Sequence, residues 1–333
     1  MNFSLIVCTY MRSKALIALL ESVKEQTLYP NEIIIVDGST NTKTKEVLSD
    51  ESYENLRYYL VDENDRGLTK QRNFGIAKVS NAIDIVCFLD DDIILTKTYF
   101  KNLIETYNDY PEAGGVGGYI INEVNWRKLK PKEKTTFTEY EIDGYVRNLG
   151  SRNVIRKKLG LLSNRSPCFM PKYSNGFSVG NLPPNNKIYE AEYFMGGVSS
   201  FKKDVVTNIK FSEYFEGYGL YEDLEYCLRV SKNYKLYVNT GATLHHYHEE
   251  GGRPNKYLYG KMVVKNGWYV WRVKYSNPSI KSRFKWNMIS LLLTIIRFSN
   301  ILTTKNRVEA FTESMGRIIG WWSLIFNKPK IES

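Results

Sequence analysis

Three consecutive carboxylates give the strongest chemical signal in the sequence. Asp90, Asp91 and Asp92 directly follow the apolar run 85–89, Ile-Val-Cys-Phe-Leu. Neighbouring carboxylates at a strand end repel one another and lose hydration, so a fold that gathers them usually supplies a cation, and a divalent metal ion is predicted here. Because side chains alternate along an extended chain, Asp90 and Asp92 can face one ligand while Asp91 faces another. The alternative is an acidic turn that caps a helix after Thr96.

Polar residues also follow two other apolar runs. Asp37 ends the run 33–36, and Thr9, Tyr10 and Arg12 follow the first run of the chain. The carboxyl ends of parallel strands meet at one edge of a sheet, where ligands usually bind. Gathered at that edge, these residues offer acceptors to a base or ribose and a cation to a phosphate, which would suit a nucleoside diphosphate. Taken singly, each is more often a turn or cap residue.

An α/β fold is needed to bring these residues together. Short apolar runs rich in β-branched residues alternate with segments of helical period, the pattern of parallel strands joined by crossover helices. The sequence predicts strands at 3–8, 32–36, 56–60 and 84–89. It also predicts a helix capped by Ser13 that ends before Pro30, with Leu16, Leu19, Leu20 and Val23 on one face, and a second helix over 69–79.

Six short motifs follow one another along about residues 3–250. They are 7–12 (Val-Cys-Thr-Tyr-Met-Arg), 35–39 (Ile-Val-Asp-Gly-Ser), 67–75 (Gly-Leu-Thr-Lys-Gln-Arg-Asn-Phe-Gly), 88–92 (Phe-Leu-Asp-Asp-Asp), 194–197 (Phe-Met-Gly-Gly) and 221–223 (Tyr-Glu-Asp). In this order they resemble motifs of the inverting family 2 glycosyltransferases. The resemblance implies a GT-A fold, a Rossmann-like and mostly parallel central sheet flanked by helices, here with a C-terminal helical extension.

The resemblance implies a role for each matching residue. Asp90 and Asp92 would form a DxD motif that holds Mn²⁺ or Mg²⁺, and His246 is chosen from the cluster His245, His246 and His248 to complete the metal shell. Contacts to the donor nucleotide would come from Thr9, Tyr10, Arg12, Asp37, Lys70, Arg72, Asn73 and Asp91. Gly196 and Gly197 would lie beside the donor or acceptor sugar, and Asp223, next to Glu222, would be the catalytic base. Without the resemblance, Glu222 and Asp223 are ordinary first-turn acids of a helix over 222–230, and the histidines could also contact phosphate or cap a strand.

The chemistry of sugar transfer agrees with these roles. Departure of a nucleotide diphosphate needs stabilisation of negative charge, which a metal at Asp92 and Asp90 would give, and the acceptor hydroxyl needs a base such as Asp223. We therefore expect a metal-dependent inverting glycosyltransferase, moving a hexosyl or deoxyhexosyl group from a nucleotide-diphosphate donor to a saccharide acceptor in cell-surface polysaccharide or glycolipid assembly. One alternative is a sugar nucleotidyltransferase, although residues 9–14 lack the glycine-rich loop of that class. Another is a non-catalytic nucleic-acid-binding protein, for which no recognisable module is present.

The positive charge of the chain is concentrated in its C-terminal part. Residues 253–333 hold 15 Lys or Arg against 3 Asp or Glu, whereas residues 1–252 hold 31 against 33, and the tail has five of the six tryptophans. Cations mixed with amphipathic rings suit an anionic membrane surface. The longest uncharged stretches there are 11 and 10 residues, while a spanning helix needs about 20. We expect a catalytic domain at 1–252 and a peripheral membrane-associating region at 253–333, with helices at 257–275, 281–303 and 306–326 and a lipid-linked acceptor. Because residues 1–10 carry no export signal, the location expected is the cytoplasmic, inner face of the membrane.

Composition, cysteines and glycines give further information on the class of protein, and the segment 122–187 has two possible interpretations. With 43% hydrophobic and 25% charged residues, the chain is unlike disordered proteins, and its four isolated cysteines, without a CxxC pair, indicate neither a disulfide framework nor a zinc site. Periodicity fades over 122–187, which predicts either a long functional loop, such as a lid or partner surface, or helices that the pattern hides. The glycines at 114, 115, 117 and 118 follow a helical segment and predict a tightly packed turn instead of a dinucleotide loop.

Overall fold

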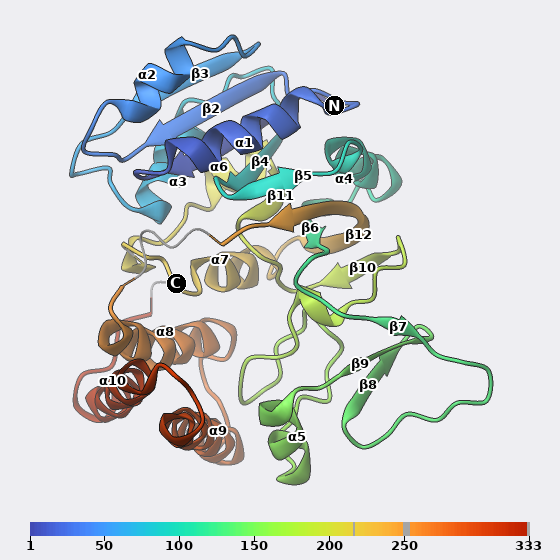
Figure 1. The fold of residues 1–333 in the computed structure, drawn as a ribbon, viewed down its shortest axis with the longest axis vertical. Helices are drawn as coiled ribbons and strands as arrows, with labels where there is room; N and C mark the ends of the chain where they lie inside the picture. Colours follow the sequence, from blue (N-terminus) through green and yellow to red (C-terminus); the bar gives the residue numbers. More distant parts are fainter. Residues whose placement is uncertain (216, 249–253, 332–333) are drawn as a thin grey trace. The chain divides into compact units, whose positions relative to one another are not determined.

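The computed structural model describes residues 1–215, 217–248 and 254–331 and divides the chain into two compact units (Figure 1). The first unit holds Met1–Val124 and Ser178–Gly252, and the second holds Asn125–Phe177 and Arg253–Ser333. The second unit therefore combines most of the segment without clear periodicity with the basic C-terminal region. The predicted domain boundary after residue 252 lies outside the described residues.

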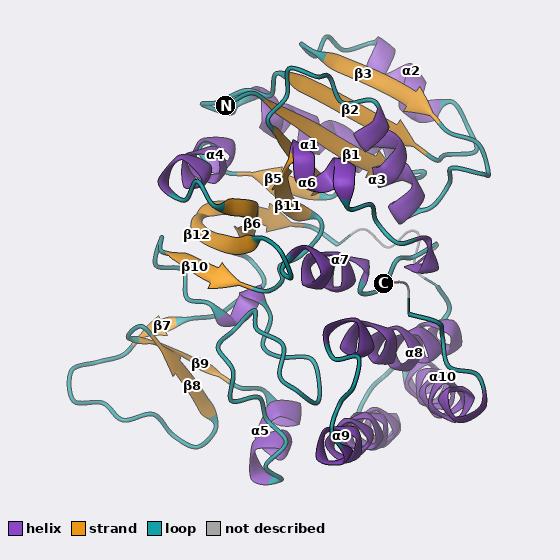
Figure 2. Cartoon of the chain, turned by 180° about the vertical axis from the view of Figure 1, so that it is seen from behind, coloured by secondary structure: helices purple, strands orange, loops and turns teal. Residues whose placement is uncertain are grey.

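A mixed, mostly parallel sheet forms the centre of the first unit, as predicted (Figure 2). In the described residues its order is β10-β12-β6-β11-β4-β1-β2-β3, with β5 paired to β12. Strands β1 to β4 run parallel, whereas β11 is antiparallel to both β4 and β6. The strands are β1 (Phe3–Thr9), β2 (Glu32–Asp37), β3 (Leu56–Leu60), β4 (Ile85–Asp90), β5 (Ile93–Leu95), β6 (Ala113–Ile120), β10 (Ile188–Ala191), β11 (Val198–Lys202) and β12 (Lys235–His246).

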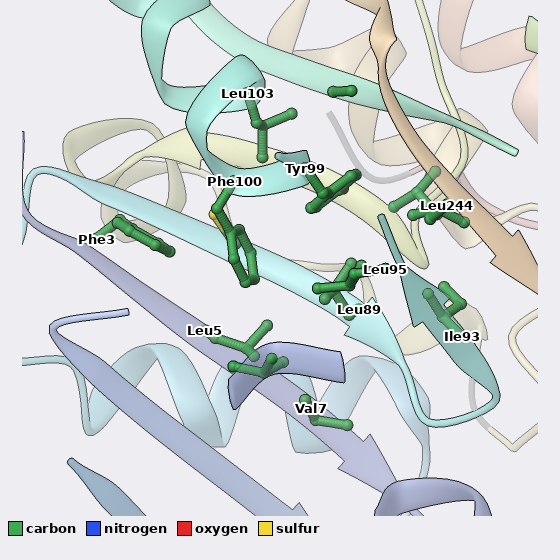
Figure 3. Close-up of a cluster of buried hydrophobic side chains, with 14 of the residues drawn as sticks. Phe3, Leu5, Val7, Leu89, Ile93, Leu95, Tyr99, Phe100, Leu103 and Leu244 are labelled. Carbon is green, nitrogen blue, oxygen red and sulfur yellow. The ribbon is translucent and has the colours of Figure 1, made fainter. Parts of the chain in front are cut away.

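Helices cover both faces of this sheet. The helices of the first unit are α1 (Ser13–Lys24), α2 (Lys43–Ser49), α3 (Leu68–Ala77), α4 (Tyr99–Asp109), α6 (Lys203–Asn208) and α7 (Glu222–Val230), with short 3₁₀ helices at Val179–Asn181 and Glu213–Phe215. Leu5 and Val7 of β1 share a buried cluster with the apolar face of α1 (Figure 3). Ile6, between them, points to the other face and lies against Gly75 of α3. The opposite directions of successive side chains thus place α1 and α3 on opposite faces.

The predicted strands and helices of the first half are confirmed, but one predicted cap is wrong. Ser13 is the first residue of α1 and not its cap. The carbonyl of Arg12 accepts the first helical hydrogen bond, from the amide of Leu16 at 3.1 Å, so Arg12 takes the cap position, and its side chain makes no cap hydrogen bond. The Arg12 guanidinium instead pairs with Asp91.

The glycine cluster forms a strand instead of the predicted turn. Residues 114, 115, 117 and 118 lie within β6, between β11 and β12. The predicted tight packing is confirmed: a Cβ at Gly115 would lie 2.5 Å from the ring of Phe201, and one at Gly117 would lie 2.6 Å from the ring of Phe194. Large aromatic side chains pack directly on the backbone of β6, and only glycine leaves them room.

The second unit combines a small sheet with helices. Its antiparallel sheet has the order β7-β9-β8, from β7 (Arg127–Lys128), β8 (Glu139–Ile142) and β9 (Tyr145–Asn148), and is followed by α5 (Ser151–Lys158). The three predicted C-terminal helices are confirmed as α8 (Lys256–Lys274), α9 (Ile280–Ser299) and α10 (Arg307–Phe326), with a 3₁₀ helix, η3, at Asn300–Leu302. Within the described residues, no helix has the length and apolar character needed to cross a membrane.

Candidate active site

The three aspartates leave β4 in two directions. Asp91 faces β1, where its carboxylate accepts hydrogen bonds from Thr9 Oγ1 at 2.7 Å and from Arg12 Nη1 at 3.1 Å. Burial raises the pKa of Asp91 to about 6, although both hydrogen bonds oppose the shift. Asp90 and Asp92 lie instead on the side of His246, with which they form one cluster. The division agrees with the expectation, but Asp91 and Asp92 stand in a turn after β4 and not in an extended strand.

The cluster of Asp90, Asp92 and His246 has the donor set of a divalent-cation site. One carboxylate oxygen from each aspartate and one imidazole nitrogen all lie within 4.8 Å of one another. Oxygen and imidazole ligands suit Mn²⁺, and carboxylate oxygens suit Mg²⁺. The residues therefore fit the metal that the resemblance implies. His246 reaches this position because it ends β12, which pairs with β5 immediately after the aspartates.

His246 is held by two residues that the sequence analysis missed. Its Nε2 lies 3.2 Å from Asp92 Oδ1, while its Nδ1 lies 2.8 Å from Glu123 Oε1. Asn122 pairs with the backbone of His246 through Nδ2 to the carbonyl at 2.8 Å and through Oδ1 to the amide at 3.0 Å. Burial lowers the pKa of His246, but the hydrogen bonds to Asp92 and Glu123 outweigh burial and raise it to about 10. Glu123 also lies 3.0 Å from Nε2 of the exposed His248.

The acidic pair at the start of α7 lies close to the aspartates. Glu222 Oε1 accepts a 2.5 Å hydrogen bond from Nη1 of the buried Arg72, whose Nη2 lies 3.7 Å from Asp90 Oδ1. Asp223 accepts from the amide of Gly196 at 3.1 Å and from that of Leu224 at 2.7 Å. Arg72 thus lies between Asp90, which belongs to the cluster of possible metal ligands, and Glu222 of the acidic pair. The family resemblance implies instead that Arg72 contacts the nucleotide, which stays a prediction.

Burial changes the proton affinity of both acids. It raises the pKa of Glu222 above its ordinary value, and the neighbouring Asp223 adds to the rise while Arg72 opposes it. It also raises the pKa of Asp223, although the amide hydrogen bonds oppose it. A carboxylate whose pKa is raised is a better proton acceptor near neutral pH than an ordinary aspartate.

Gly196 and Gly197 stand between these groups. A Cβ at Gly197 would lie 2.0 Å from Asp90 Oδ2, and a Cβ at Gly196 would lie 2.8 Å from Glu222 Oε1 and 2.9 Å from Arg72 Nη1. Any larger residue would displace Asp90 or Glu222. The two glycines therefore allow β4 and α7 to bring their carboxylates to one place.

Some of the residues expected to contact the nucleotide make hydrogen bonds to other groups of the protein. Asp37 is buried and accepts from Tyr58 Oη at 2.9 Å and from the Ser39 amide at 2.8 Å. Asn73 uses both ends of its amide on the backbone of Phe211, at 2.9 and 3.0 Å. Tyr10 is exposed, and Lys70 lies half-buried in the first turn of α3. Nucleotide contacts by these residues stay predictions.

Gln71 is a further residue that the sequence analysis left without a role. Its Nε2 donates to the carbonyl of Thr9 at 3.1 Å and to that of Val36 at 2.8 Å. These bonds join the ends of β1 and β2, which carry Thr9 and Asp37. Gln71 therefore fixes the spacing of the two strand ends.

Comparison with known proteins gives the family. The model of "Glycosyl transferase family 2" matches residues 4–171. Over 110 residues the chain is 31% identical to the O-antigen chain rhamnosyltransferase RfbN of Salmonella typhimurium, a match that covers 33% of this chain and only 34% of that protein. Over 257 residues it is 22% identical to the GalNAc(5)-diNAcBac-PP-undecaprenol beta-1,3-glucosyltransferase of Campylobacter jejuni, covering 73% of this chain and 67% of that one.

A solved structure shares the fold. The mannosyltransferase PcManGT from Pyrobaculum calidifontis, in complex with GDP-Man and Mn²⁺, aligns with a TM-score of 0.55 and 13% identity, covering 98% of this chain and 88% of its own. At this identity the similarity concerns the fold alone. The GT-A fold expected from the sequence is confirmed, and the chain belongs to glycosyl transferase family 2.

Proposed function

We propose that this family 2 glycosyltransferase is metal-dependent and inverting, and that it transfers a sugar from a nucleotide-diphosphate donor to a saccharide acceptor. The observation that carries the proposal is the cluster of Asp90, Asp92 and His246 next to the acidic pair of α7. A divalent cation held by this cluster would stabilise the negative charge of the departing diphosphate. The neighbour that binds GDP-Man and Mn²⁺ supports this reading.

The protein's own groups have separate tasks in this proposal. Asp223 takes the proton of the acceptor hydroxyl, and its half-buried carboxylate has the raised pKa that suits a general base. Arg72 holds Glu222 in place and turns toward Asp90. Arg12, which follows β1, and Asp91, which follows β4, would contact the nucleotide. With no enzyme nucleophile in the scheme, the hydroxyl attacks opposite the leaving group and the anomeric configuration inverts.

The acceptor is proposed to be a lipid-linked saccharide in cell-surface polysaccharide or glycolipid assembly. One relative is named for the O-antigen chain and another for an undecaprenol-linked acceptor, which supports this class. The positive charge of residues 253–333 would bring the enzyme to an anionic membrane from the cytoplasmic side. The transferred sugar is proposed to be a hexose or deoxyhexose.

Donor turnover tests the proposal. Purified protein is incubated with Mn²⁺ and a panel of UDP-, GDP- and dTDP-sugars, and release of the nucleoside diphosphate is measured with and without EDTA. Asp223→Asn should abolish transfer while leaving Mn²⁺-dependent donor binding intact, and Asp92→Asn should weaken both. Full transfer by Asp223→Asn would remove Asp223 from its role. Release of pyrophosphate from a nucleoside triphosphate would indicate a nucleotidyltransferase instead.

A further inference from the structure

Helix α9 carries a continuous stripe of exposed apolar side chains. They recur at intervals of three and four residues, which places them on one side of a helix. The stripe continues into η3 and consists of Ile280, Phe284, Met288, Leu291, Ile295, Phe298 and Leu302. A helix of a folded domain normally turns such a stripe to the core, so an exposed one of this length marks an interaction surface.

Helix α10 carries a second stripe with the same spacing. Val308, Phe311, Ile319, Trp322 and Phe326 are exposed, and the half-buried Met315 fills the gap between Phe311 and Ile319. The two helices run antiparallel in contact: the rings of Phe298 and Phe311 lie 6.4 Å apart, and Trp321 Nε1 donates to Asn287 Oδ1 at 2.8 Å. The two stripes are therefore neighbours along the length of the helix pair.

Both stripes lie on the side of the pair that faces away from α8. Trp286 of α9 stacks on Trp271 of α8 with the ring centroids 5.7 Å apart. In α10, Gly316 allows close approach to α8, because a Cβ there would lie 2.0 Å from the carbonyl of Tyr257. At 100° per residue the α9 stripe stands opposite Trp286, and the α10 stripe stands about 100° from Gly316 and about 140° from Gly320, which also meets α8. The two helices thus present one joint apolar face, which we call the α9–α10 face.

The charge around this face indicates which partner it fits. The tail has a large excess of Lys and Arg, and Lys281, Arg283, Lys305 and Arg307 lie on or between the two helices. A second copy of the chain would bring the same positive charges together. A surface of anionic lipid would pair with them, while Phe and Trp side chains enter the boundary between headgroups and acyl chains.

We propose that the α9–α10 face inserts shallowly into a membrane leaflet rich in anionic lipid. This inference rests on the membrane association proposed above and names the surface responsible for it. The two helices would lie parallel to the membrane plane, with their apolar side chains in the interface and their lysines and arginines at the lipid phosphates. Such docking would hold the enzyme at the layer where a lipid-linked acceptor is found.

Vesicle binding tests the proposal with a pair of variants matched in exposure. Leu291 on α9 is 53% exposed and Leu60 on β3 is 52% exposed. Leu291→Glu and Leu60→Glu therefore add the same charge at equally exposed leucines, one inside the face and one outside it. Sedimentation with phosphatidylcholine vesicles, with and without phosphatidylglycerol, measures the partition of each protein. Thermal melting verifies that both variants are folded, and Trp322→Glu repeats the test on α10.

The expected result is binding of wild type and Leu60→Glu to phosphatidylglycerol vesicles, with the partition coefficient of Leu291→Glu about tenfold or more lower, since a buried leucine is replaced by a charge. Binding should weaken with added salt and be much lower on pure phosphatidylcholine. Equal partition of Leu291→Glu and wild type would overturn the proposal. The proposal would also be overturned if the wild-type protein were a dimer, Leu291→Glu were a monomer, and neither protein bound vesicles. Asp92→Asn should keep wild-type vesicle binding, so failure of the docking idea is distinct from failure of the proposed catalysis.

Discussion

Replacing Gly197 by alanine should weaken metal binding by moving Asp90. The added Cβ would lie 2.0 Å from Asp90 Oδ2 and 2.2 Å from its Cγ, whereas ordinary contact begins at 3.4 Å. The carboxylate must therefore retreat by about 1.4 Å, while metal–ligand distances tolerate changes of only about 0.2 Å. Asp90 would no longer share one cation with Asp92 and His246. We expect the Kd for Mn²⁺ to rise by at least the ~10- to 100-fold that follows disturbance of a ligand's support.

Titration calorimetry of Mn²⁺ into the protein measures this effect, and a double-mutant cycle identifies its cause. Asp90→Ala removes the group that the new methyl would strike. Gly197→Ala should then cost little further affinity in the Asp90→Ala background, because the two changes act through the same contact. Thermal melting checks that Gly197→Ala is folded. Wild-type affinity in Gly197→Ala, or an equal loss in both backgrounds, would refute the steric reasoning.

Three further predictions follow from the same contacts. Glu123→Ala should raise the Kd for Mn²⁺ by about 10- to 100-fold without unfolding the protein, because it frees the imidazole of His246; Mn²⁺ electron paramagnetic resonance measures the bound fraction. In EDTA, stability should fall between pH 4.5, the ordinary pKa of Glu222, and about 8, its pKa in the folded protein, because the folded state keeps a proton there that the unfolded state has lost. Urea unfolding should show a slope of at most about 1.4 kcal/mol per pH unit from this group, and Glu222→Gln should flatten it. Gly115→Ala should destabilise the fold by about 1–3 kcal/mol in urea, because its Cβ would lie 2.5 Å from the ring of Phe201.

Much of the fold and the general position of the site could be predicted from the sequence. Continuous apolar runs identify buried parallel strands, and the polar residues after those runs must reach one edge of the sheet. Thr9, Asp37 and the aspartates after β4 follow this rule. Strand alternation also predicts that Asp91 separates from Asp90 and Asp92; the separation is observed, but it arises in the turn that follows the end of β4 at Asp90.

The partners across the fold could not be predicted, because they depend on pairings between distant segments. Arg72 meets Glu222 across 150 residues, and Glu123 meets His246 across 123. Glu123 shows why one of these was missed. It follows β6, so the strand-end rule would have found it, but β6 is rich in glycine, which is depleted in strands. Aromatic packing from other elements makes it a strand, and that packing has no local sequence signal.

The different hydrogen-bond partners of Glu222 and Asp223 support the proposal that Asp223 is the base. The carboxylate of Glu222 accepts a charge-assisted bond from Arg72, which occupies one of its oxygens and opposes, without cancelling, the rise in its pKa caused by burial. Asp223 instead accepts from the backbone amides of Gly196 and Leu224, which orient it without a full positive charge in direct contact. Burial raises the pKa of Asp223, although these amide bonds and the charge of Arg72 oppose the shift. A general base needs a fixed direction and an affinity for the proton, so in the proposed mechanism Asp223 takes the proton, while Glu222 would hold Arg72 beside Asp90.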